Sequence, residues 1–264
     1  MIFGGLVSIT FRQLAPEEIV ALVARAGLEG IEWGGDVHVP HGDLARAAAV
    51  RRMTADAGLA VAAYGSYYRV GVSEGEGLRF EAVLETAVAL GAPLIRVWAG
   101  NRGSAAADGA WRARVVGEAR RIAGLAQAAG IAVAFEYHRN TLTDTNESAV
   151  RLLAEAGHPN LRSYWQPPVG ATTASCLEGL NGVSYCLAHL HVFHWLAQGE
   201  AIERRPLAEG ADAWAQYLAV ARATGRDHFA LIEFVRGDAP EQFLADAQAL
   251  KRWLSSVRAA AGDG

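Results

Sequence analysis

Six times along the chain, an alanine-rich segment with helical spacing ends in a glycine, and a short apolar run follows. The glycines are Gly27, Gly58, Gly91, Gly130, Gly157 and Gly225. Glycine adopts positive φ without steric cost and commonly ends a helix, so each of these positions predicts a junction from helix to strand. The junctions recur roughly every 30 residues, except that the last interval is about twice as long.

Two further apolar segments complete the pattern. GLVSIT at the N-terminus and CLAHLHVFHW, inside the long last interval, bring the expected strands to eight. The helical segments carry one apolar stripe, as in Ile19, Leu22, Val23 and Ala26. Eight strands alternating with helices predict an α/β fold, a (β/α)8 TIM barrel, as a single domain over residues 1–264. A doubly wound open sheet is the alternative, but no glycine-rich phosphate loop follows the first strand.

The composition narrows the functional classes. The 264 residues are 52% hydrophobic, and the net charge of −4 is spread along the chain without a basic stripe, which argues against a nucleic-acid partner. Cys176 and Cys186 lack the close pairing of a zinc knuckle or a redox motif, as expected of reduced thiols. The apolar N-terminus lacks the basic region and cleavage site of a signal peptide, and no run is long enough to cross a membrane. We therefore expect a soluble, cytoplasmic protein.

Candidate chemistry lies where the strands end, because TIM barrels place their active sites at the carboxyl ends of the strands. In HLHVFHW, alternation puts His189 and His191 on one face, with His189 deeper, and His194 on the other. The last inward positions of four successive strands are Glu136, Gln166, His191 and Glu233. Two buried carboxylates beside an imidazole are most simply explained by a divalent cation. The alternative is that the glutamates pair with arginines while His191 is an ordinary core residue.

Other polar and aromatic residues surround the same expected mouth. The candidates for substrate contacts are Glu32, Arg96, Trp98, His138 and Tyr64. Ordinary structural roles are the alternatives: a loop cap for Glu32, a salt bridge to a nearby glutamate for Arg96, and an exposed loop position for Tyr64 and its neighbours. His38 and His41 follow the second strand and are expected to be solvated loop residues rather than ligands.

The strand ends FEYH, HLHVFHW and LIEF, within the eight-unit pattern, resemble the xylose isomerase-like TIM-barrel superfamily of sugar isomerases and epimerases. The resemblance extends over nearly the whole chain. Typical members bind one divalent metal through a glutamate, an aspartate, a histidine and a second glutamate, which implies Glu136, Gln166, His191 and Glu233 here. Gln166 replaces the usual aspartate, and Val169 stands where many members have a histidine. An uncharged amide oxygen implies weaker binding or a different preferred metal.

The resemblance implies an enzyme with one divalent ion, Mn²⁺, Mg²⁺, Co²⁺ or Zn²⁺, and a small sugar-like substrate. The main hypothesis is an isomerase or epimerase of a sugar, an inosose or a related hydroxy-keto compound, with Glu136 and Glu233 removing and returning a proton through a metal-stabilised enediolate. A dehydratase or lyase on the same scaffold and a non-catalytic sugar-binding protein are the alternatives. An endonuclease is disfavoured, because it would need several zinc ions and a basic groove. A homo-oligomer is compatible with the fold.

Overall fold

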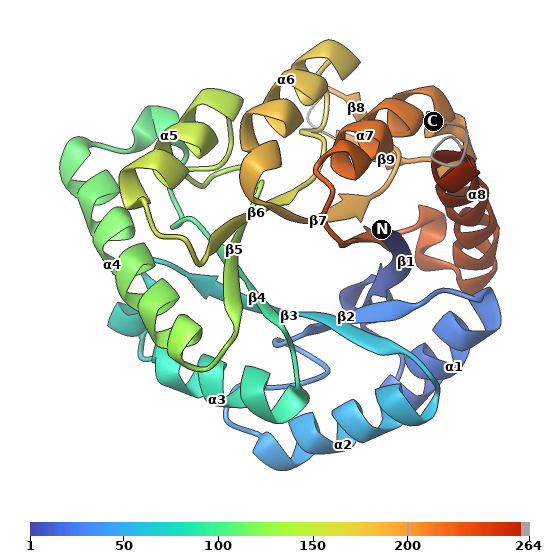
Figure 1. Ribbon diagram of the computed structural model, residues 1–264, viewed down its shortest axis with the longest axis horizontal. Coiled ribbons are helices and arrows are strands. Elements are labelled where there is room, and N and C mark those ends of the chain that lie inside the picture. Colours follow the sequence, from blue (N-terminus) through green and yellow to red (C-terminus); the bar gives the residue numbers. More distant parts are fainter. Residues whose placement is uncertain (200, 260–264) are drawn as a thin grey trace.

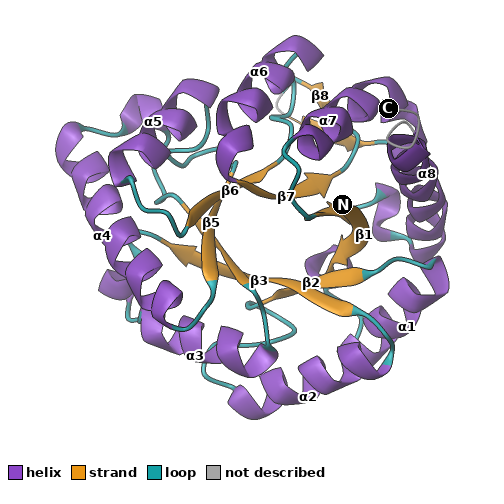
Figure 2. Cartoon of the chain, viewed as in Figure 1, coloured by secondary structure: helices purple, strands orange, loops and turns teal. Residues whose placement is uncertain are grey.

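The computed structural model describes residues 1–199 and 201–259, so residue 200 and residues 260–264 of the expected domain lie outside it. Parallel strands close into a barrel, and helices surround it as an outer ring (Figures 1 and 2). The barrel strands are β1 (Ile2–Val7), β2 (Gly30–Gly34), β3 (Ala60–Arg69), β4 (Leu94–Trp98), β5 (Ala132–Glu136), β6 (Leu161–Trp165), β7 (Leu187–Val192) and β10 (His228–Ile232). Their order around the barrel is β1-β10-β7-β6-β5-β4-β3-β2, which confirms the predicted (β/α)8 fold.

The long helices follow the barrel strands in sequence. They are α1 (Pro16–Ala26), α2 (Leu44–Asp56), α3 (Phe80–Leu90), α4 (Gly109–Ala128), α5 (Asn146–Ala156), α6 (Thr173–Val183), α7 (Ala211–Ala223) and α8 (Pro240–Ala259). Across residues 1–199 and 201–259, none of the helices has both the length and the apolar character needed to cross a membrane.

Local sequence sets where these helices begin and end. The six junction glycines, Gly27, Gly58, Gly91, Gly130, Gly157 and Gly225, all have φ between 55° and 72°, as predicted. At the other end, the side chains of Asp43, Asp108, Thr145 and Thr172 each accept a hydrogen bond from a backbone N–H of the first helical turn. These caps fix where α2, α4, α5 and α6 begin.

Side chains alternate between two cores on either side of the sheet. On β5, Val133 and Phe135 pack against the helices, whereas Ala134 belongs to the cluster inside the barrel. Glu136, the next inward position, is the last residue of the strand. This alternation matches the sequence prediction and directs polar strand ends into one barrel mouth.

The long last interval contains an element that the apolar pattern did not predict. β8 (Trp195–Gln198) and β9 (Ala201–Arg204) form an antiparallel hairpin between β7 and α7. Trp195 pairs with Arg204, and Ala197 pairs with Ile202. Paired residues share a face of the hairpin, and these four all line a pocket at the barrel mouth. The interval therefore contains the seventh barrel strand, as expected, and also a hairpin that lines one side of the pocket at the barrel mouth.

The barrel strands approach one another so closely at Gly5 on β1 that no larger side chain fits there. A Cβ atom at this position would collide with the carbonyl oxygen of Gly30 and the side chain of Leu231. Because a paired backbone carbonyl cannot move away alone, we expect Gly5→Ala to lower the free energy of unfolding by about 2 kcal/mol or more in chemical denaturation. Gly75→Ala is the matched control, since no atom lies within 4 Å of its added methyl group. Equal stability of the two variants would contradict the prediction.

Candidate metal centre and active site

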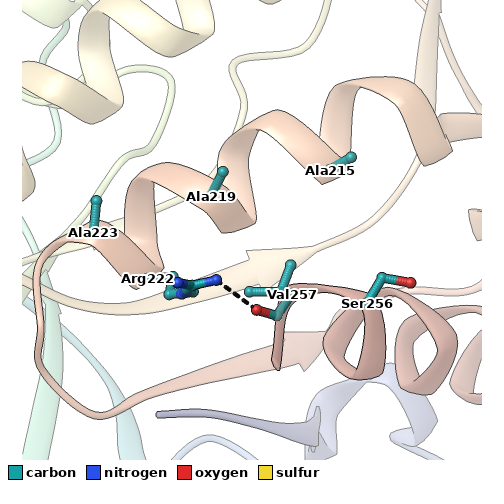
Figure 3. Close-up of a pocket in the computed structure, with 6 residues that line it drawn as sticks. All are labelled: Ala215, Ala219, Arg222, Ala223, Ser256 and Val257. Carbon is teal, nitrogen blue, oxygen red and sulfur yellow. Dashed lines mark hydrogen bonds between the residues drawn. The ribbon is translucent and has the colours of Figure 1, made fainter. Parts of the chain in front are cut away.

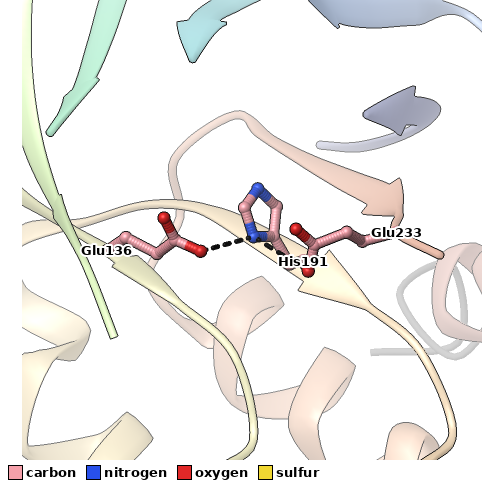
Figure 4. Close-up of side chains that lie close together, drawn as sticks. All are labelled: Glu136, His191 and Glu233. Carbon is pink, nitrogen blue, oxygen red and sulfur yellow. Dashed lines mark ion pairs between the residues drawn. The ribbon is translucent and has the colours of Figure 1, made fainter. Parts of the chain in front are cut away.

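Three ionisable side chains converge at the carboxyl ends of β5, β7 and β10 (Figure 4). Glu136 ends β5, His191 lies near the end of β7, and Glu233 directly follows β10. One nitrogen or oxygen of each lies within 4.8 Å of the others. Nδ1 of His191 is 3.4 Å from Oε1 of Glu136 and 3.6 Å from Oε2 of Glu233. All three residues are buried, and such a donor set can hold a divalent cation.

The fourth residue expected in this set, Gln166, directly follows β6. Its Oε1 is 3.0 Å from Nδ1 of His191, and its Nε2 donates a hydrogen bond to the carbonyl of Tyr137 at 2.5 Å. The bond to the backbone orients the amide so that its oxygen faces the site. The structure therefore brings together all four residues that the strand ends predicted.

A buried ion-pair network lies beside these residues. Arg96 on β4 donates from Nε to Glu32 at 2.7 Å and from a terminal nitrogen to Glu136. Trp98 Nε1 donates to the same carboxylate of Glu136 at 2.6 Å. Glu32 also lies 3.2 Å from Nε2 of His191 through its other oxygen. The salt bridge considered for Arg96 is therefore present. Glu32 is 0% exposed, and within the described residues its carboxylate contacts the side chains of Arg96 and His191 rather than capping a loop.

The surrounding charges set the protonation states of the site. Burial by itself would raise the pKa values of Glu32 and Glu136, but Arg96 and His191 outweigh it, so the pKa of Glu32 falls to about 2 and that of Glu136 is held well below its usual range. Burial, with the charge of Glu136, raises the pKa of Glu233 to about 7. Burial alone would lower the pKa of His191, but Glu233 and Glu32 raise it to about 10. Glu233 is thus the carboxyl group of this set that titrates near neutrality.

The histidines of the β7 segment separate as the alternation of the strand predicts. His189 lies deeper than His191: its Nδ1 accepts a hydrogen bond from the Phe229 N–H at 3.1 Å, and its Nε2 is 3.2 Å from the Ala62 carbonyl. Burial lowers the pKa of His189 to about 4. His194 turns away from the site, and its ring lies against Gly210. Of the three, only His191 contacts the convergent carboxylates.

Aromatic side chains line two sides of the mouth. On one side, the ring of His138 stacks on Trp98 with their centroids 4.5 Å apart. On the other, Phe193 and Trp195 are stacked at 3.8 Å, and the Trp195 indole N–H donates to the carbonyl of Phe234 at 3.3 Å. Trp98 and His138 therefore lie at the mouth, as expected. The second aromatic group comes from the residue after β7, the hairpin and the residues after β10.

A pocket of about 600 Å³ opens between these aromatic groups and the hairpin. The residues that line it follow β5, β6, β7 and β10 or belong to the hairpin, and they include His138, Gln166, Phe193, Trp195, Arg204 and Phe234. A separate hollow lies in the outer layer between α7 and α8, lined by Ala215, Ala219 and Ala223 (Figure 3). The charged residue there, Arg222, already donates to the Val257 carbonyl at 2.7 Å, so the pocket at the mouth is the better candidate for substrate binding.

Two expectations about the mouth need correction. Tyr64 lies on the outer face of β3, and its hydroxyl donates to the Val39 carbonyl at 2.8 Å, away from the carboxylates. Tyr67 is the tyrosine of this strand that reaches the barrel interior. His38 is buried, not solvated, with Nδ1 at 3.0 Å from Ser8 Oγ, and His41 contacts the Tyr64 hydroxyl at 2.7 Å. These contacts are long-range, and no local pattern marks them.

Comparison with known proteins identifies relatives of more than one activity. The 3-dehydroshikimate dehydratase of Bacillus anthracis is 31% identical over 175 residues, which cover 59% of this chain and 61% of that protein. The match thus spans less than two thirds of the length of this curated relative. The crystal structure of the probable 3-DHS dehydratase AsbF, involved in petrobactin synthesis in the same organism, has a TM-score of 0.81 and 25% identity, and the match covers 95% of this chain and 99% of that one.

Two more distant structures share the fold. A xylose isomerase-like TIM barrel protein from Mycobacterium smegmatis, solved in complex with magnesium, has a TM-score of 0.76 and 16% identity over 97% of both chains. D-psicose 3-epimerase has a TM-score of 0.70 and 17% identity, over 97% of this chain and 98% of that one. At these identities the likeness concerns the barrel alone.

The resemblance noted at the strand ends is confirmed by the family comparison. The sequence profile of the family described as xylose isomerase-like TIM barrel matches residues 20–256, which include seven of the eight barrel strands and all four convergent strand ends. The chain therefore belongs to the xylose isomerase-like TIM barrel family.

Proposed function

We propose that this protein is a divalent-metal-dependent dehydratase that removes water from a cyclic hydroxy-ketone of the 3-dehydroshikimate type. The observation that carries the proposal is the convergence of Glu136, His191 and Glu233 within 4.8 Å, next to an aromatic-lined pocket. The relation to 3-dehydroshikimate dehydratase supports this reaction more strongly than the sugar isomerisation or epimerisation that the strand ends first suggested.

The donor set fits a hard or borderline cation. Glu136 and Glu233 offer carboxylate oxygens, Gln166 an amide oxygen and His191 its Nδ1, a mixture suited to Mn²⁺, Mg²⁺, Co²⁺ or Zn²⁺. Glu32 accepts a hydrogen bond from Nε2 of His191, which leaves Nδ1 for the ion. A bound cation would polarise the substrate ketone and so lower the pKa of the neighbouring C–H group.

Glu233 is the proton acceptor in this proposal. Within residues 1–199 and 201–259 its carboxylate has no hydrogen-bond donor closer than His191, 3.6 Å away, so it is available to accept a proton from the substrate. Glu233 removes the proton on the carbon next to the ketone, and the electron pair forms a C=C bond as hydroxide leaves the next carbon. The same carboxyl group returns its proton to that hydroxide, so the substrate loses one water.

The aromatic sides of the pocket favour a flat ring as the substrate. His138, which stacks on Trp98, lines the pocket, and so do Phe193 and Trp195, which stack on each other. Dehydration of a hydroxylated cyclohexenone flattens the ring toward an aromatic product, and offset stacking on aromatic side chains stabilises such a ring. The pocket volume of about 600 Å³ is ample for a molecule of this size.

An epimerase of a hydroxy-ketone is the second candidate, and the pairing of two buried glutamates favours it. Glu136 and Glu233 come from β5 and from the residue after β10, so they can approach a substrate from different sides. One would remove the proton and the other would return it to the opposite face. Burial alone would raise the pKa of Glu136, but the charge of Arg96 outweighs it and holds this pKa well below that of Glu233. Glu136 is therefore the poorer proton carrier.

Incubation with 3-dehydroshikimate tests the dehydratase proposal. We expect a product lighter by one water with the absorbance of a dihydroxybenzoate, formed with added Mn²⁺ and abolished by a chelator. Glu233→Gln should lower kcat by about 10³-fold, because it removes the proton acceptor. Glu241→Gln, at an exposed position of α8, is the control and should leave kcat unchanged. Product of unchanged mass would favour the epimerase, and no conversion by the wild type would contradict the dehydratase.

Metal affinity should rise steeply with pH. His191, with its pKa raised to about 10, must lose a proton to bind a cation at any pH below that value, and Glu233 must lose one below about 7. The Kd for Mn²⁺ should therefore fall roughly tenfold per pH unit between pH 7 and 9, and more steeply, approaching a hundredfold per unit, below pH 7. Calorimetric titration at several pH values measures this, and a Kd independent of pH between 6 and 8 would exclude these ligands.

Glu32→Gln separates orientation of His191 from direct ligation. The substitution keeps the shape of the side chain but removes its charge. The charged carboxylate accepts hydrogen bonds from Nε2 of His191 and from Nε of Arg96. We expect the Kd for Mn²⁺ to increase about 10- to 100-fold, with the metal stoichiometry still near one at saturation. Glu74→Gln removes an exposed ion pair to Arg121 and serves as the control. Binding by Glu32→Gln with the affinity of the wild type would show that Glu32 does not orient the ligand.

A further inference from the structure

The pairing of β3 with β4 is irregular next to the site. Gly65 pairs with Arg96 and Tyr68 pairs with Val97, so two residues of β3, Ser66 and Tyr67, lie opposite a single step of β4. Tyr67 has φ of 55°, in the left-handed region that residues with a Cβ rarely adopt. Such a conformation costs about 1–2 kcal/mol and persists only where the surrounding structure imposes it.

This bulge turns the ring of Tyr67 into the barrel mouth. The guanidinium carbon of Arg96 lies 4.7 Å from the ring centroid, and Trp98 meets the ring edge-on at 5.4 Å. The charges that act on the phenol belong to Arg96, Asp36, Glu136 and Glu233. Tyr67 therefore lies among the carboxylates of the site, and its ring packs against the Arg96 guanidinium that pairs with them.

The hydroxyl of Tyr67 is left without a partner. Its oxygen is buried and makes no hydrogen bond of regular geometry within the part of the chain that the structure describes, although the Arg12 side chain lies near it. The neighbouring tyrosines differ: the hydroxyl of Tyr64 donates to the Val39 carbonyl, and that of Tyr68 donates to Glu118. A buried unsatisfied hydroxyl costs about 1–3 kcal/mol. The protein thus maintains a strained backbone and an unpaired donor at the same residue.

We propose that the Tyr67 hydroxyl binds the substrate directly, by donating a hydrogen bond to an oxygen of the cyclic hydroxy-ketone. This inference rests on the proposed function and assigns it a catalytic residue that does not lie at the end of β5, β6, β7 or β10. Burial raises the pKa of Tyr67 far above neutrality, so the phenol remains a donor throughout the working pH range. A fixed donor that meets charge developing on a substrate oxygen contributes most in the transition state.

Tyr67→Phe tests the proposal, because it keeps the ring over Arg96 and removes only the hydroxyl. With 3-dehydroshikimate and Mn²⁺, we expect kcat/KM to fall roughly 100-fold, mostly in kcat, while the Mn²⁺ Kd stays unchanged. The thermal midpoint should stay equal or increase, because an unsatisfied group is removed. Tyr68→Phe, on the outer face of the same strand, should instead keep kcat/KM and lose stability, because Glu118 loses a donor.

The remaining outcomes separate this inference from the proposed function. Activity of Tyr67→Phe within about twofold of the wild type, or a loss of stability that accounts for its lower activity, would overturn the role of Tyr67 and leave the dehydratase intact. If the wild type does not dehydrate the substrate, calorimetric binding of 3,4-dihydroxybenzoate to the Mn²⁺-loaded proteins decides. Binding weakened tenfold or more in Tyr67→Phe supports the contact, and equal binding, or none by the wild type, overturns it.

Discussion

The buried guanidinium of Arg96 is the interaction on which the rest of the site depends. Glu32, Glu136 and Glu233 are all buried at the barrel mouth, and a buried carboxylate without compensation costs several kcal/mol. Arg96 pairs with Glu32 and Glu136 while itself only 1% exposed. Removal of its charge would leave His191 as the remaining charged partner of both carboxylates. Arg96 therefore allows the fold to keep an anionic mouth even before a metal ion binds.

The position of this one cation also explains why the carboxylates differ. Arg96 contacts Glu32 and Glu136 and holds both ionised, whereas Glu233 lies across the mouth and has a pKa near 7. His191 lies between the two groups: Nε2 faces Glu32, and Nδ1 faces Glu136 and Glu233. Glu32, held by Arg96, thus fixes the imidazole so that Nδ1 is directed to the cation site. In the proposed function, orientation of the His191 ligand and selection of Glu233 as proton acceptor follow from the same buried charge.

The sequence predicted the site where position depends on local alternation, and failed where it depends on pairing between strands. Glu136, Gln166, His191 and Glu233 converge as predicted because each is the last inward position of its own strand. Tyr64 was placed at the mouth, but the inward position of β3 beside Arg96 is Gly65, whose added Cβ would lie 2.5 Å from Glu32. Only the small residue fits there, and the bulge that brings in Tyr67 instead exists only against β4. The hairpin β8–β9 was missed for the same reason, because four-residue strands carry too few positions to show a period.

Epimerisation and dehydration begin with the same proton removal, so the metal ligands alone do not distinguish them. The difference must come from groups that act after that step. Epimerisation needs a second carboxyl group that exchanges protons readily, and Arg96 together with Trp98 holds Glu136 as a stable anion. Dehydration needs an environment that binds a flattening ring better than the puckered substrate, and aromatic residues such as Phe193, Trp195 and Phe234 line the pocket. The charge distribution and the aromatic lining are therefore the features that agree with the proposed dehydratase rather than with the proposed epimerase.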